Sequence, residues 1–176
     1  GGYSDEVGGE PAPGNYYDAA FSADWPAENT LRVRVQIIDK YFGNLVKEAA
    51  VELLKSWGYT VEDVGPFTRE SCDYSDYANA VCKRVVDGRA DRGILVCFSG
   101  IGMSIAANRW RGVRATLIRS PQVAALSRQH NNSNVMCLAA AYVNMDMLEE
   151  VLSTWLDAEF EGGRHQRRLD KMPIAK

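Results

Sequence analysis

The chain has 176 residues, of which 46% are hydrophobic and 24% are charged, and its formal net charge is -3. These values exclude a disordered chain, and no apolar run approaches the roughly 18 to 20 residues that a membrane span requires. A chain of this length buries enough apolar surface to fold as one domain without a structural metal or disulfide.

Residues 1–30 are rich in Gly, Pro, Ala and acidic residues, and they contain no Lys or Arg. They lack a periodic apolar pattern, so we interpret them as an acidic extension or linker ahead of a single domain at 31–172. Four aromatic residues leave open that part of this stretch packs on the domain or on a partner subunit: Tyr16, Tyr17, Phe21 and Trp25.

From Leu31 onward, short β-branched runs alternate with segments of helical periodicity. The runs predict five strands, at Leu31–Ile38, Tyr59–Val64, Gly93–Cys97, Val113–Ile118 and Asn134–Leu138. The segments between and after them predict five helices, at Asn44–Trp57, Tyr74–Asp87, Gly102–Trp110, Pro121–His130 and about Asp146–Glu159.

This alternation predicts an α/β fold with a doubly wound, five-stranded parallel sheet, most simply in the flavodoxin-like order of a Rossmann-like three-layer sandwich. Ligands of such folds bind beyond the carboxyl ends of the strands. We therefore expect the site just after Ile38, Cys97 and Ile118, and near the end of the fourth helix.

Residues 31–176 carry 20 basic and 17 acidic residues, a small excess that argues against general nucleic-acid binding. From residue 161 the tail is basic. It could bind one small anion or form a solvated surface, and its cations are Arg164, Arg167, Arg168 and Lys171.

The four cysteines form no CxxC pair, and with only His130 and His165 available there is no zinc-ligand spacing. We therefore expect no metal and no cofactor. The N-terminus shows no basic segment followed by an apolar core, so we expect a cytoplasmic protein with reduced thiols.

A glycine-bearing turn follows the third strand and leads into a helix, in the run Cys97-Phe98-Ser99-Gly100-Ile101-Gly102. Such a turn aims backbone N–H groups at one point, where they favour an oxyanion and a thiolate. Cys97 is then a base or nucleophile, although a lone cysteine on an apolar strand is more often buried and inert. A dinucleotide-binding loop is disfavoured, because Ile105 replaces the third Gly or Ala.

These residues resemble the type B ribose-5-phosphate isomerase family, whose relatives include galactose-6-phosphate isomerase. The similarity lies in CFSGIGMSIAAN at 97–108, SRQHN at 127–131 and EGGRHQRR at 161–168, with DYSDY at 73–77 and Trp155-Leu156. It implies a metal-independent aldose–ketose isomerase of a small phosphorylated sugar, acting through a cis-enediolate.

By motif position, the resemblance implies that Cys97 is the base, that His130 opens the sugar ring with help from Ser99, and that Asp39 orients hydroxyl groups. The backbone amides of residues 98–102, including those of Phe98, Gly100 and Gly102, would hold the oxyanion. The other implied substrate contacts are Lys40, Asn131, Arg164 and Arg168.

Three positions depart from the family pattern around the substrate. Lys40 stands where a phosphate-contacting histidine is usual, Phe98 replaces a glycine, and Ala141 replaces a phosphate-binding arginine. The pattern suggests altered substrate choice among pentose, tetrose and hexose phosphates.

Two other classes of protein stay open: an accessory subunit without catalysis, and a sugar-phosphate-binding module. The resemblance also implies a homodimer or homotetramer with shared active sites, in which the segment carrying His130 reaches the Cys97 pocket of a neighbouring chain.

Overall fold

The computed structural model describes residues 6–7, 10–11, 18–23, 32–33, 43–65 and 73–172, and it has an α/β fold. The helices are α1 (Gly43–Ser56), α2 (Tyr74–Val86), α3 (Ile101–Ala107), α4 (Pro121–Asn131), the short 3-10 helix η1 (Ala140–Tyr142), α5 (Met145–Asp157) and α6 (Arg164–Leu169). The strands are β1 (Glu6–Val7), β2 (Glu10–Pro11), β3 (Asp18–Ala23), β4 (Arg32–Val33), β5 (Thr60–Asp63), β6 (Arg92–Cys97), β7 (Ala115–Ile118) and β8 (Val135–Ala139).

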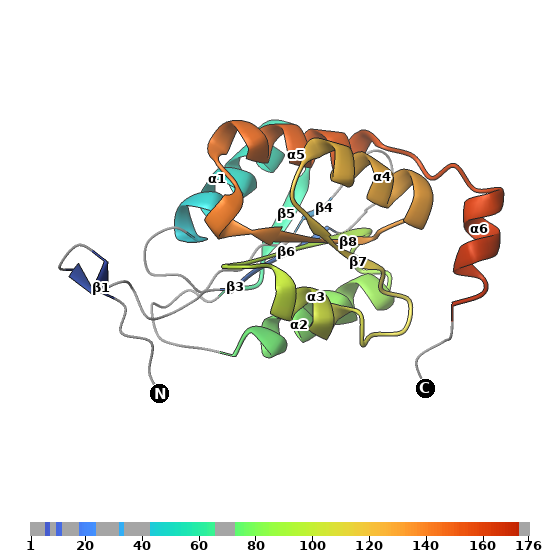
Figure 1. Cartoon of the computed structure of the whole chain (residues 1–176), viewed down its shortest axis with the longest axis horizontal. Helices are drawn as coiled ribbons and strands as arrows, with labels where there is room; N and C mark the ends of the chain where they lie inside the picture. The colour runs from blue at the N-terminus through green and yellow to red at the C-terminus, as the bar shows by residue number, and fades with distance from the viewer. Residues whose placement is uncertain are drawn as a thin grey trace.

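The main sheet has the strand order β4-β5-β3-β6-β8-β7. Strands β6, β8 and β7 are parallel, as are β4 and β5, whereas β3 pairs antiparallel with both β5 and β6. In Figure 1, α1, α4 and α5 cover one face of the sheet, and α2 and α3 cover the other. The α/β class and the layered arrangement predicted from sequence are confirmed.

Two details of the sheet differ from the sequence prediction. The flavodoxin-like order would place β7 beside β6, but β8 lies there and β7 is at the edge. All residues of β8 are buried, whereas β7 is only partly buried, and this difference in burial cannot be read from two short apolar runs. The sheet also contains the antiparallel β3, which comes from the segment interpreted as an extension. The domain boundary at residue 31 stays a prediction.

Alternation along β6 divides the core into two layers. Ile94 and Val96 pack in a cluster with buried residues of α1, α4 and α5, including Trp155. Leu95 and Cys97 point to the other face and pack with buried residues of α2 and α3. Because side chains of a strand alternate between faces, this central strand is apolar throughout and holds both layers together.

Side-chain caps define the ends of two helices. Ser120 precedes Pro121 and accepts a hydrogen bond from the Val123 N–H (3.3 Å), which starts α4. Asn144 accepts one from the Met147 N–H (2.8 Å) and starts α5. Helix α4 stops at Asn132, which adopts a left-handed conformation (φ 46°).

Cys82, Cys97 and Cys137 are free and buried. Burial raises the pKa of the Cys82 thiol to about 12, so this sulfur stays protonated near neutral pH. Within the part of the chain that the structure describes, every helix is too short or too polar to cross a bilayer. The cytoplasmic location expected from the sequence stays a prediction.

Replacing Trp155 by alanine should destabilise the fold by about 3–5 kcal/mol, because this fully buried ring fills the layer under α4 and α5. The ring also lies 5.8 Å from the Arg128 guanidinium and 6.0 Å from that of Arg92. Urea unfolding measures the loss, with the exposed Met172→Ala change as the control. A loss below about 1 kcal/mol would show that this layer does not stabilise the fold as described.

Candidate active site

Cys97 lies at the carboxyl end of β6, at the edge where the parallel strands β8 and β7 also end. It pairs with Ala139, and Ile118 of β7 pairs with Leu138. We call this side of the sheet the carboxyl edge. The prediction that Cys97 and the residues following it lie where an α/β sheet binds ligands is consistent with this position.

The Cys97 sulfur accepts a hydrogen bond from the Gly100 N–H at 2.9 Å. The thiol is 6% exposed, so it lies just beneath the loop that leads into α3. An N–H donated to sulfur favours the thiolate over the thiol, and it does so more strongly where water is largely excluded. The loop is therefore built around a sulfur that can carry negative charge.

Glycine is required at two positions of this loop. Gly100 has a φ of 72°, and a side chain there would collide with the Leu117 side chain and lie 3.2 Å from the Leu138 backbone. A Cβ at Gly102 would lie 2.9 Å from the ring of Tyr74. The loop thus crosses the end of β8 and reaches β7. This close approach requires residues without a side chain at positions 100 and 102.

The other two residues of the loop face outward or toward the helix. The Ser99 hydroxyl oxygen accepts the Ile101 N–H (3.3 Å) at the start of α3. Phe98 is 41% exposed, and its carbonyl accepts the Ala141 N–H (3.2 Å), which ties the loop to η1. The carboxyl edge therefore combines a thiol, a hydroxyl, backbone amides and an exposed aromatic ring.

His130 and Asn131 lie at the opposite side of the sheet, which we call the amino edge. Helix α4 links the parallel strands β7 and β8, so it must run back to the edge where β8 begins. Buried Arg128 holds this helix end by donating to the Ser133 carbonyl (2.6 Å) and to Asn132 (3.1 Å). Burial lowers the pKa of Arg128 to about 10, and the cations Arg92 and Arg114 add to the effect.

A cluster of two histidines, a glutamate and an arginine forms where α4 ends and α6 begins. The rings of His130 and His165 are stacked, with centroids 4.1 Å apart and planes at 8°. The Glu161 carboxylate lies 3.4 Å from His165 Nε2 and 3.9 Å from His130 Nε2. Arg164 Nε donates to His165 Nε2 (3.2 Å).

The donor atoms of His130, Glu161 and His165 lie within 4.8 Å of one another, as the ligands of one metal ion would. The arrangement suits a metal poorly, because parallel stacked rings do not direct their lone pairs at a common point. The Arg164 guanidinium also already donates to the His165 nitrogen that would bind the ion. The cluster fits an anion-binding or proton-transferring role better.

The sequence interpretation did not include His165 and Glu161 among the site residues. Their four-residue spacing around Gly162 and Gly163 was a usable signal, because two glycines with φ of 64° and 52° turn the chain sharply. That turn brings the buried His165 (4% exposed) back against α4. Asp39 and Lys40, two of the predicted site residues, lie outside the described residues.

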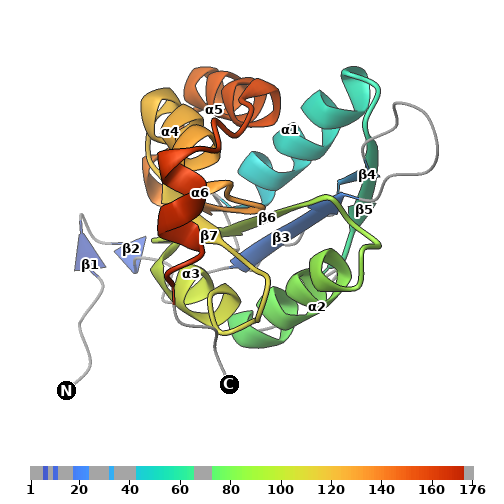
Figure 2. The same ribbon diagram turned by 90° about the vertical axis from the view of Figure 1, so that its right-hand side faces the viewer.

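Within one chain, the predicted site residues that the structure describes do not come together. Cys97, Phe98, Ser99, Gly100 and Gly102 lie at the carboxyl edge. His130, Asn131, Arg164 and Arg168 belong to the amino edge and α6, and Figure 2 shows α6 in front of the strand starts, beside α4. The five residues of β8 separate the two edges by roughly 13 Å at the usual strand rise.

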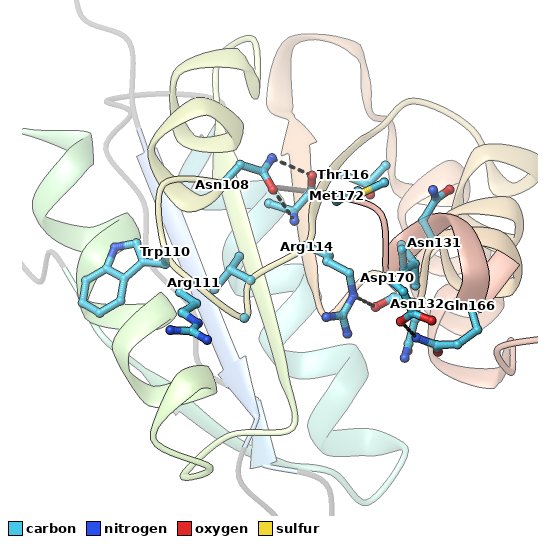
Figure 3. Close-up of a pocket in the computed structure, with 14 residues that line it drawn as sticks. Asn108, Trp110, Arg111, Arg114, Thr116, Asn131, Asn132, Gln166, Asp170 and Met172 are labelled. Carbon is cyan, nitrogen blue, oxygen red and sulfur yellow. Dashed lines mark hydrogen bonds between the residues drawn. The ribbon is translucent and has the colours of Figure 1, made fainter. Parts of the chain in front are cut away.

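A cavity of about 590 Å³ lies at the amino edge, between the start of β7 and α6. In Figure 3, Arg114, Asn131, Asn132 and Gln166 line it, and Arg114 Nε donates to the Asn132 carbonyl (2.8 Å). The thiol of Cys97 does not line this cavity. The cavity therefore belongs to the groove beside α6. The Cys97 loop, which is the candidate site of proton transfer, lies at the other edge of the sheet.

Comparison with known proteins finds a match of residues 35–172 to the family model described as Ribose/Galactose Isomerase. The chain is 40% identical over 130 residues to ribose-5-phosphate isomerase B of Escherichia coli, covering 74% of this chain and 87% of that protein.

Two solved structures are also similar. One is a ribose 5-phosphate isomerase from Thermotoga maritima, with 43% identity, a TM-score of 0.71, and coverage of 73% of this chain and 88% of that chain. The other is ribose-5-phosphate isomerase B from Mycoplasma genitalium with bound ribulose-5-phosphate, with 42% identity, a TM-score of 0.69, and coverage of 72% and 85%.

The histidine cluster leads to a prediction of how the stability of the fold depends on pH. Burial lowers the pKa of His165, the neighbouring His130 and the positive charges of Arg164 and Arg168 lower it further, and Glu161 acts in the opposite direction. The folded protein thus binds fewer protons here than the unfolded chain. His165 therefore stabilises the fold above the ordinary histidine pKa of 6.5, and this contribution is lost as pH falls through the lowered value.

NMR titration of the imidazole nitrogens measures this effect. The midpoint of His165 should lie below 6.5, move further down in Glu161→Gln and move up in Arg164→Ala. A midpoint at or above 6.5 in the native protein would contradict the electrostatic description of the cluster.

Proposed function

The chain belongs to the ribose/galactose isomerase family and is a sugar-phosphate aldose–ketose isomerase, and we propose that it interconverts ribose 5-phosphate and ribulose 5-phosphate with Cys97 as the base. The observation that carries the proposal is the hydrogen bond from the Gly100 N–H to the Cys97 sulfur at the carboxyl edge. It places the sulfur, as the candidate base, beside the backbone amides of residues 98–102, the candidate oxyanion donors. These are the two elements that proton transfer next to a carbonyl needs.

The proposed reaction moves one proton from C2 to C1 and another from O2 to O1, and leaves the other atoms of the sugar in place. The Cys97 thiolate takes the proton from C2 of the open-chain aldose, and the C–H electron pair forms the C1–C2 double bond of a cis-enediolate. Negative charge develops on O1, where amides of residues 98–102 donate. A proton then passes from O2 to O1, and the thiol returns a proton to C1 to give the ketose.

The remaining site residues have roles that follow the family motifs. His130, assisted by Ser99, transfers the proton that opens the sugar ring, and Asp39 orients hydroxyl groups. Asn131 contacts the substrate beside the histidine, and Lys40, Arg164 and Arg168 bind the phosphate. Arginine suits this task because its planar guanidinium donates two parallel hydrogen bonds to phosphate oxygens.

We further propose that each working site combines two chains, in a homodimer or in a homotetramer built from such dimers. The separation of the Cys97 loop from the His130 cluster in one chain supports this, because the base and the ring-opening histidine act on neighbouring atoms of one sugar and cannot do so from roughly 13 Å apart. Exposed apolar side chains around the loop also fit a contact surface: Phe98 (41%), Ile101 (48%) and Ile105 (56%).

Cys97→Ser should lower kcat by on the order of 10²–10⁴-fold with little effect on folding, because a hydroxyl is a far weaker base than a thiolate. Steady-state isomerisation of ribose 5-phosphate measures it, with Cys82→Ala as the matched control, since that buried sulfur faces α3 away from the loop. Near-native turnover in Cys97→Ser would rule out the thiol as the base. An accessory subunit would show no turnover even in the native chain.

Shared sites predict complementation between two inactive chains, Cys97→Ala and His130→Ala. Random mixing of equal amounts should restore about a quarter of the native sites, because half of the dimers are mixed and each contains one intact site. Activity is assayed after subunit exchange, and native mass spectrometry counts the mixed dimers. Mixed dimers without activity would show that the two residues serve one chain's own site.

A further inference from the structure

Arg119 is the first residue after β7, and so it lies at the same edge of the sheet as Cys97. Its side chain is exposed, and no carboxylate of the described residues forms an ion pair with it. Lys47, another cation on the described part of this side, is paired with Asp63 at 2.8 Å. Arg119 therefore presents a positive charge beside the loop that carries the thiol.

Tyr142 contacts the Arg119 guanidinium and orients it. The Arg119 guanidinium carbon lies 5.9 Å from the centre of the Tyr142 ring, within the range of a cation–π contact. Tyr142 belongs to η1, which follows β8, and β8 lies between β6 and β7. The guanidinium thus rests on a residue that stands between its own strand and the strand of Cys97.

The same turn is bonded to the Cys97 loop. The Ala141 N–H donates to the Phe98 carbonyl (3.2 Å), and Gly100 packs on Leu117, two residues before Arg119. Arg119, η1 and the loop amides consequently form one continuous surface. Ala141 itself contributes only a methyl group, and among the described residues Arg119 places a positive charge next to it.

The spacing suits the length of the substrate. Strand β7 is two strands away from β6, which corresponds to about 10 Å at the usual spacing between strands. A pentose phosphate bound with C1 and C2 at the thiol extends its phosphate across β8 toward this charge. An arginine at this distance from the thiol favours sugar phosphates whose carbon chain between C1 and the phosphate is long enough to span it.

We propose that Arg119, held against Tyr142, is a phosphate-binding residue of the chain that supplies Cys97, and that it helps to determine which sugar phosphate is accepted. The inference rests on the proposed function. It adds to Arg164 and Arg168 a cation from the other side of the shared site. The phosphate would then be held between two chains, with Arg119 setting its distance from the thiol.

The test is steady-state kinetics of Arg119→Gln, with Arg109→Gln as the matched control, because Arg109 is an exposed arginine that follows α3 at the amino edge. Loss of a charge-assisted hydrogen bond should raise KM for ribose 5-phosphate by about 10- to 100-fold, with kcat nearly unchanged. Arg119→Lys should recover part of the affinity. Tyr142→Phe should keep KM near native, whereas Tyr142→Leu should raise it.

Two readouts separate phosphate recognition from a general effect on the fold. Unphosphorylated ribose should react equally with native and Arg119→Gln protein, and inorganic phosphate should inhibit the variant more weakly. A KM and a phosphate inhibition constant within about twofold of native would overturn the proposal, while the isomerase activity would still stand. If the native chain isomerises no sugar phosphate, calorimetry of inorganic phosphate with both proteins tests Arg119 alone, and equal affinities overturn it.

Discussion

A helix that joins two parallel strands must return to the edge where the second strand starts, and this constraint governs the candidate site. It places Cys97, at the end of β6, at one edge, and His130, at the end of α4, at the other. Two of the candidate site residues, a thiol and a histidine, therefore lie at opposite edges of the sheet in the same chain. This separation is the reason for our proposal that a second chain supplies the histidine to the thiol.

At the carboxyl edge, the backbone conformation of the loop positions the hydrogen-bond donor of the Cys97 sulfur. Gly100 adopts a left-handed conformation and packs on Leu117 and Leu138, and this close approach directs its N–H at the Cys97 sulfur. The same loop is bonded to η1, whose Tyr142 holds Arg119. The Cys97 thiol, the loop amides and the Arg119 cation are thus linked through the ends of three neighbouring strands. The amino edge is arranged differently, with two stacked histidines in contact with one carboxylate and one arginine.

The sequence predicted the helices, the α/β class and the loop at Cys97 well, because apolar periodicity and glycine spacing are local signals. It did not predict the strand order, since β7 and β8 are both short apolar runs and only packing decides which is central. Nor did it predict the antiparallel β3, which has no periodic pattern. His165 and Tyr142 were not among the predicted site residues, because their contacts with His130 and Arg119 join segments that are far apart in the sequence.

The central claim is that a thiol at the carboxyl edge transfers a proton between C2 and C1 through an enediolate. Incubating ribose 5-phosphate with the protein in deuterium oxide and following the C2 hydrogen by NMR tests it most directly. The account predicts that ribulose 5-phosphate forms with deuterium at C1, and that the recovered ribose 5-phosphate exchanges its C2 hydrogen for solvent deuterium. Product formed wholly without deuterium would indicate direct transfer of hydrogen between the carbons and would contradict the account.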